Sequence, residues 1–148
     1  MKSEMKNSLI VGVLLAGLCA VGAADKKHLG GPKGGRLFEN TDPKGEFFLE
    51  PDHTATITFY DSALKPVAVA DQAVMVIADA RGEKQKIEFE QKGDVLASKG
   101  RLPEGDGYNL VVLFKQKPDA RPQNFRFQLE THTCGTCQRA EYACICGH

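Results

Sequence analysis

Four cysteines and two histidines lie within the last seventeen residues of this 148-residue chain, and their types and spacing could bind a metal ion. Residues 132–148 read HTCGTCQRAEYACICGH, a Cys-x-x-Cys pair followed after six residues by a Cys-x-Cys pair. Thiolates are good ligands of zinc and of Cu(I), and imidazole nitrogens complement them. The pattern therefore predicts a metal centre. Its candidate ligands are Cys134, Cys137, Cys144, Cys146, His132 and His148.

Two other uses of the same cysteines stay open. Two disulfides would also order the tail, and they would run from Cys134 and Cys137 to Cys144 and Cys146, because the last two are too close for an easy mutual bond. A redox Cys-x-x-Cys is a third interpretation, but that motif belongs at a helix start in a βαβ pattern, which this sequence lacks. The flanking His132 and His148 favour the metal centre over the two disulfides, because a disulfide-bonded tail would give these histidines no role. Tyr142 is placed to pack the centre against the rest of the fold.

The first 24 residues have the pattern of a secretory signal. A short basic start precedes an almost wholly apolar run over 9–21, and small residues precede the polar Asp25. Counted through the small residues to Ala24, the apolar run is about 16 residues long. This is shorter than the roughly 20 residues that are needed to span a bilayer. We expect cleavage after Ala23 or Ala24 and no stable membrane span afterwards. Lipidation at Cys19 is disfavoured because the large Leu18 precedes it. The mature protein is expected in the periplasm or secreted, in an oxidising compartment.

Composition argues against several classes of function. The chain has 19 basic and 19 acidic side chains and a pI of about 6.9, which disfavours nucleic-acid binding and a polybasic membrane anchor. The length of the chain allows one domain. Its contents of hydrophobic and of charged residues are ordinary for a soluble protein. The glycines of 30–35 neither follow a strand nor open a helix, so they are not a phosphate loop. No nucleophile–base arrangement can be argued, and we predict no enzyme.

Short runs of β-type residues dominate the chain from residue 46 onward. Thr54–Tyr60 is the clearest, with threonines alternating with Ala55, Ile57 and Phe59. The runs recur at roughly 10-residue spacing with no convincing helix between them. They predict an all-β fold, an antiparallel immunoglobulin-like β-sandwich of about seven strands, with a small barrel or jelly roll as alternatives. The expected strands are 46–50, 54–60, 73–78, 84–91, 94–98, 107–115 and 124–130. The expected core is Ile57, Phe59, Val74, Val76, Ile77, Ile87, Phe89, Leu110, Val112, Phe114, Phe125, Phe127 and Leu129.

The segment before the strands is rich in glycine and lysine and has no apolar periodicity, which predicts a flexible arm. His28 misses the third mature position that an amino-terminal copper site needs, and His53 sits in a turn as a surface residue. The expected organisation is a signal peptide over 1–24, an arm over 25–45, a β-sandwich domain over 46–130 and a Cys/His-rich tail over 131–148.

Several short motifs between residues 28 and 130 recur in a known kind of exported module. They are His28, Gly34-Gly35, Glu46-Phe47-Phe48-Leu49, Phe59-Tyr60-Asp61 and Leu64-Lys65-Pro66-Val67. In these features the chain resembles immunoglobulin-like β-sandwich modules associated with bacterial heavy-metal efflux systems, alone or fused to periplasmic adaptor subunits. The chain departs from them in having one histidine where they have a His-rich start, and in its Cys-rich tail. The resemblance implies a metal-handling setting and no catalytic role.

Together these patterns predict an exported, non-enzymatic protein that binds zinc or copper. Its expected role is that of an accessory in metal homeostasis or efflux, with a metal ion and an envelope or efflux-system protein as partners. The alternative is a structural or protein-interaction β-sandwich module whose C-terminal cysteines form two disulfides.

Overall fold

The computed structural model describes residues 30–147, so the predicted signal segment, Cys19, His28 and His148 lie outside the described residues. The described chain is built almost wholly of β-strands. They are β1 (Arg36–Leu37), β2 (Lys44–Leu49), β3 (Ala55–Tyr60), β4 (Pro66–Val67), β5 (Ala73–Ala80), β6 (Glu83–Lys92), β7 (Val95–Ser98), β8 (Tyr108–Lys115) and β9 (Gln123–Leu129). A single 3₁₀ turn, η1 (Glu141–Ala143), follows them. Within 30–147 no helix is long and apolar enough to cross a membrane.

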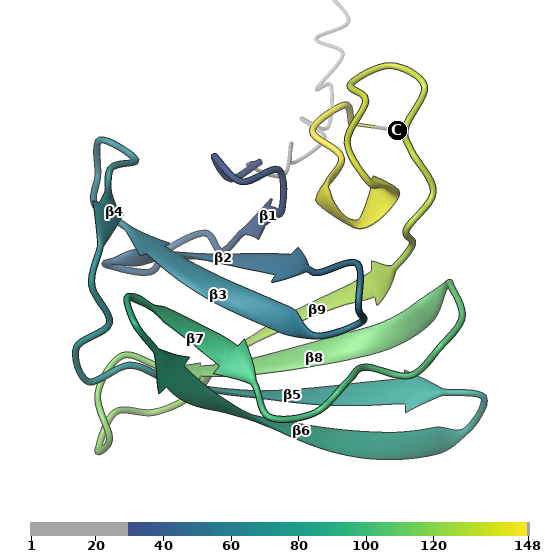
Figure 1. The fold of residues 1–148 in the computed structure, drawn as a ribbon. Helices are drawn as coiled ribbons and strands as arrows, with labels where there is room; N and C mark the ends of the chain where they lie inside the picture. The colour runs from purple at the N-terminus through teal and green to yellow at the C-terminus, as the bar shows by residue number, and fades with distance from the viewer. Residues whose placement is uncertain (1–29, 148) are drawn as a thin grey trace, which may run out of the picture.

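All neighbouring strands are antiparallel and follow one hydrogen-bonded path, β1-β2-β3-β7-β6-β5-β8-β9, with β4 paired to β3 off this path. The sheet curls into a half-barrel with two facing walls (Figure 1). The long strand β6 connects the walls, because residues 83–88 pair with β5 whereas residues 89–92 pair with β7. The immunoglobulin-like sandwich therefore stays a prediction, and what the structure shows is an antiparallel all-β sheet curled on itself.

Each of the seven strands expected from the sequence is present, displaced by no more than a few residues at its ends. In β3 the alternation is realised as predicted, because Ala55, Ile57 and Phe59 are fully buried and the intervening threonines are half-buried. The additional strands β1 and β4 have two residues each. Two residues are too few to produce an alternating pattern, so sequence periodicity could not predict them.

The core lies between the walls of the curled sheet. Its largest fully buried apolar side chains are Phe38, Phe47, Phe59, Phe114, Ile57, Leu110, Leu129, Val76 and Val112. The prediction that Ile77 belongs to the core is wrong. Val74, Val76 and Ala78 point inward from β5, so Ile77, between them, lies on the outer face. Phe89 and Phe125 are only partly buried, at the margin of the core.

The expectation of a flexible arm over 25–45 is wrong for the described part, residues 30–45. The carboxylate of Glu46 is fully buried and accepts hydrogen bonds from the backbone N–H groups of Gly35 (2.7 Å) and Lys33 (3.1 Å) and from the Tyr60 hydroxyl (2.7 Å). Position 31, next to this carboxylate, requires glycine, because a β-carbon there would overlap the Glu46 side chain. A long-range contact of one carboxylate thus orders a glycine-rich segment.

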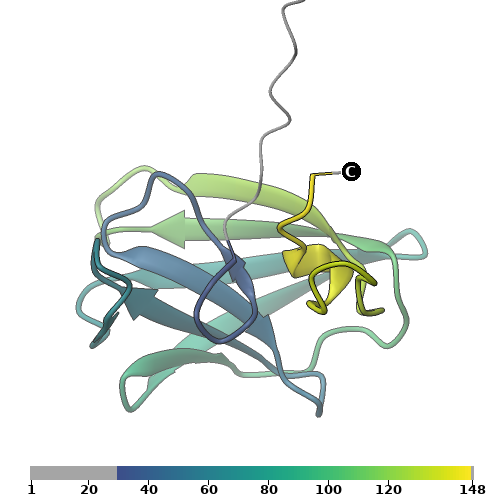
Figure 2. The same ribbon diagram turned by 90° about the horizontal axis from the view of Figure 1, so that it is seen from above.

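The two ends of the strand path, β1 and β9, face each other without a backbone ladder between them. Side chains close this gap: the Phe38 ring stacks on Phe125 at 4.5 Å between centroids, and the Phe47 ring meets Phe127 edge-on at 5.5 Å. We call this gap, lined by these four phenylalanines, the seam. The C-terminal tail lies over one end of it, beside the loop that precedes β1, as both ribbon views show (Figures 1 and 2).

Candidate metal centre

The first cysteine pair lies in a tight antiparallel hairpin that begins just after β9. Thr133 and Ala140 form a β-bridge, and the Cys134 N–H donates to the Arg139 carbonyl at 2.8 Å. The turn places Gln138 in the left-handed region at φ 59°, and its side-chain amide donates to the Gly135 carbonyl at 2.9 Å. Local hydrogen bonds of this kind define the turn that presents the Cys-x-x-Cys pair.

The second pair follows the 3₁₀ turn η1. The Cys144 N–H donates to the Glu141 carbonyl at 3.0 Å, and the backbone at Cys144 is extended with φ −64° and ψ 136°. The backbone N–H of Cys146 lies 3.4 Å from the Cys144 sulfur and donates to it. The chain therefore turns back at η1 and brings Cys144 and Cys146 to the hairpin.

The sulfur atoms of Cys134, Cys137, Cys144 and Cys146 all lie within 4.8 Å of one another. The Cys144 Sγ is 3.5 Å from that of Cys134 and 3.7 Å from that of Cys137. Four sulfurs placed tetrahedrally about 2.3 Å from a zinc ion are separated by ~3.8 Å. A disulfide needs about 2.05 Å, and no disulfide joins any of these four cysteines in the structure. The arrangement is compatible with a single tetrahedrally bound metal ion.

The pKa values of the clustered thiols are shifted in different directions. Backbone N–H groups of Ile145 and Arg139 donate to the Cys137 sulfur and hold the pKa of this thiol below its usual value. The backbone N–H of Cys146 lowers the pKa of Cys144, but burial and the three neighbouring thiols outweigh it and raise this pKa to about 12. Thiolates this close repel one another, so a bound cation is what would let all four ionise together.

The predicted histidine ligands are not among the four clustered side chains. His132 is exposed, and its Nδ1 lies 3.6 Å from the Asp106 carboxylate. His148 lies outside the described residues. Of the six ligands expected from the sequence, the structure therefore brings together the four cysteines.

Tyr142, which lies between the two cysteine pairs, is a core residue with 5% of its surface exposed. Its ring meets Phe47 edge-on at 5.9 Å and stacks on Phe127 at 6.2 Å. Its hydroxyl accepts a hydrogen bond of 3.1 Å from the Leu49 N–H, and its own N–H donates to the Glu130 carbonyl at 2.9 Å. The expectation that Tyr142 packs the tail against the fold is confirmed.

Two arginines that the sequence did not single out also hold the tail. Arg36 of β1 donates to the Tyr142 carbonyl at 3.2 Å, and Arg139 donates to the Gly31 carbonyl at 3.1 Å. Each bond joins residues more than a hundred positions apart. No local pattern marks such arginines, so only the folded chain could reveal them.

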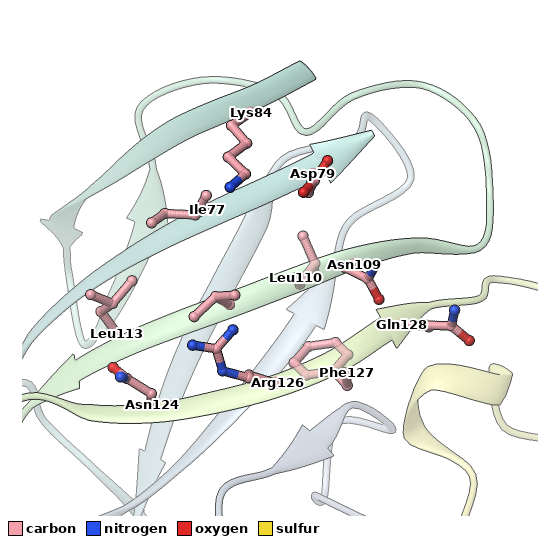
Figure 3. Close-up of a pocket in the computed structure, with 11 residues that line it drawn as sticks. Ile77, Asp79, Lys84, Asn109, Leu110, Leu113, Asn124, Arg126, Phe127 and Gln128 are labelled. Atoms are coloured by element: carbon pink, nitrogen blue, oxygen red, sulfur yellow. The ribbon is translucent and has the colours of Figure 1, made fainter. Parts of the chain in front are cut away.

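A concave surface lies on the outer face of the wall formed by β5, β8 and β9, and none of the four clustered cysteines lines it. It is a hollow of about 590 Å³ with an apolar floor that includes Ile77 and Leu113 (Figure 3). Val111 also lines it. Its polar rim is Asp79, Lys84, Asn109, Asn124, Arg126 and Gln128. The rim offers hydrogen bonds and a single carboxylate, with no cysteine, histidine or serine among its lining residues. It does not have the ligand set of a metal site.

No family model, no curated protein and no solved structure matches this chain. The fold and the site therefore define the class by themselves: an all-β protein that carries a four-cysteine cluster compatible with metal binding at the end of its sheet.

Proposed function

We propose that this chain is an exported metal-binding protein that holds one zinc ion between Cys134, Cys137, Cys144 and Cys146. The observation that carries the proposal is the convergence of these four sulfurs to within 4.8 Å of one another. A tetrahedral set of four sulfurs suits zinc, whereas copper, the other metal that the sequence allows, is an outcome of the test below. The zinc would be bound by thiolates, and the chain would release their protons on binding.

The biological role that we propose is that of an accessory in metal homeostasis outside the cytoplasm. The secretory pattern of residues 1–24 and the resemblance of residues 28–130 to efflux-associated modules support this role. A binding function is favoured over catalysis for a physical reason. Four protein ligands complete a tetrahedral zinc site and leave no position for water or substrate, which catalytic zinc sites keep open.

Elemental analysis of the mature protein from its native compartment, with a thiol count before and after chelation, tests the proposal. We expect about one zinc per chain and four thiols that react only after the chelator has removed it. Cobalt substitution should give the absorption of a tetrahedral thiolate site. Protein with no metal and four oxidised cysteines would overturn the proposal in favour of a disulfide-bonded tail, and stoichiometric copper would change the metal assigned.

Two variants sharpen this test. Cys137→Ser removes a ligand and should abolish stoichiometric zinc binding. His132→Ala is the matched control, since His132 lies against Asp106 and outside the sulfur cluster. Loss of zinc from the histidine variant would contradict the all-cysteine centre.

A further inference from the structure

We infer that metal binding and closure of the seam are one coupled equilibrium, and that Tyr142 is the positioning residue that couples them. The inference rests on the proposed zinc site. Tyr142 binds no metal itself. It lies in the six-residue connection between Cys137 and Cys144, and its ring contacts the seam residues Phe47 and Phe127.

The position of Tyr142 determines how the two cysteine pairs meet. Backbone hydrogen bonds of 2.9 Å from Glu141 to the His132 carbonyl and from Tyr142 to the Glu130 carbonyl attach η1 to the strand end that leads into the hairpin. Cys144 follows η1 directly. If the tyrosine ring left the core, these bonds would break and Cys144 would move away from the hairpin.

Apart from Tyr142, Ala143 and the hydrogen bonds of Arg36 and Arg139, the tail has little packing that would keep it docked. Within 131–147 the buried residues are Cys134, Tyr142 and Ala143, and the others are half-buried or exposed. A segment that buries so little apolar surface does not offset the entropy of ordering its backbone. A metal ion that cross-links Cys134 and Cys137 to Cys144 and Cys146 removes much of that entropy, so it holds the docked conformation.

Metal binding and docking of the tail are linked thermodynamically. A ligand that binds only the docked tail stabilises docking, and any contact that stabilises docking tightens metal binding by the same factor. Loss of the metal should therefore release Tyr142 and uncover Phe47 and Phe127 at the seam. The zinc site would then report metal availability as a change in the apolar surface at one end of the sheet, which is a sensing function rather than simple storage.

Zinc transfer to a chromophoric chelator tests the role of Tyr142 in the full-length mature protein. Tyr142→Ala should weaken zinc binding and speed transfer by roughly 10–100-fold, as for other residues that orient metal ligands. Tyr142→Phe keeps the ring and loses the bond to the Leu49 N–H, so it should restore most of the affinity. Phe114→Leu is the control for general destabilisation, because Phe114 is fully buried and packs on Phe59 in the core. Equal transfer rates for Tyr142→Ala and Phe114→Leu would overturn the inference.

Hydrogen exchange of the wild-type protein tests the coupling without any variant. Chelation should remove the protection of the Leu49 and Tyr142 amides, whereas the amides of Val76 and Val112 in the opposite wall should keep theirs. Unchanged protection of Leu49 and Tyr142 on zinc removal would overturn the coupling even if zinc binds stoichiometrically. A wild-type protein that takes up no zinc at all would instead overturn the proposed function, so the two failures are distinguishable.

Discussion

The guanidinium of Arg36 donates a hydrogen bond of 3.2 Å to the backbone carbonyl of Tyr142, and the same group lies 4.8 Å above the ring centroid of Phe127. One side chain of β1 therefore contacts both the tail and β9, the strand at the other end of the sheet path. Because no backbone ladder joins β1 to β9, such contacts carry much of the stability of the seam.

Arg36→Ala should lower the free energy of unfolding by about 1–3 kcal/mol, because it removes a charged hydrogen bond and a cation–π contact. Urea denaturation of the zinc-loaded protein would measure this loss. Arg121→Ala is the matched control, since Arg121 is exposed and should change stability by no more than ~0.5 kcal/mol. A similar loss in both variants would contradict a specific role for Arg36.

Glu46→Gln should destabilise the fold by about 2–3 kcal/mol. The carboxylate accepts three hydrogen bonds from protein donors, and an amide in its place presents an N–H₂ group to donors that then have no acceptor. The same urea measurement applies. Glu88→Gln, on the exposed side of β6, should be close to neutral, so equal effects at the two positions would show that the buried carboxylate is not what orders residues 30–35.

Gln138→Val should weaken zinc binding and lower stability by about 1–2 kcal/mol, because a β-branched residue is poorly tolerated in the left-handed region. Gln138→Gly should preserve both, since glycine adopts this conformation freely and that freedom offsets the lost bond to the Gly135 carbonyl. Competition titration with a zinc chelator, together with thermal unfolding, checks the pair. If the valine variant bound zinc as well as the glycine variant, the turn would not be a determinant of the site.

Zinc affinity should fall as the pH is lowered, because protons compete with the metal for the thiolates. The Cys144 thiol, with its pKa raised to about 12, is protonated at neutral pH in the metal-free protein, so zinc must displace its proton. Each displaced proton weakens binding by roughly tenfold per unit fall in pH. Competition titrations between about pH 6 and pH 8 would give the slope. His132→Ala should show the same slope, and a shallower one would indicate that the histidine is a ligand after all.

Much of the candidate site could be predicted because its cysteines lie close together in the sequence. The spacing of the cysteines predicted that Cys134, Cys137, Cys144 and Cys146 converge. The aromatic ring of Tyr142, between the two pairs, indicated how the tail could pack against the fold. Spacing could not separate a metal centre from two disulfides, since both need the sulfurs to converge. The sulfur distances of 3.5 and 3.7 Å, with no disulfide among the four cysteines, are properties of the folded chain.

The errors in the predicted fold have a common physical origin. Ile77 belongs to a continuous apolar run, and such a run does not indicate which of its residues face the core. Residues 30–45 have no periodicity, so nothing in that segment indicated that Phe38 stacks on Phe125 or that Gly35 donates to Glu46. Phe125 lies most of the chain away from Phe38, and even the 11 positions between Gly35 and Glu46 exceed what a local pattern can indicate.

The all-β character, the seven principal strands and the four candidate sulfur ligands could be predicted from the amino-acid sequence, because side-chain alternation and cysteine spacing are patterns over a few residues. Tertiary structure alone decided the curl of the sheet, the seam between β1 and β9 and the anchoring of the tail by Arg36 and Arg139. The curl depends on how β6 divides its pairing between β5 and β7. The seam and the tail contacts join segments separated by most of the chain, which become close only when the core forms.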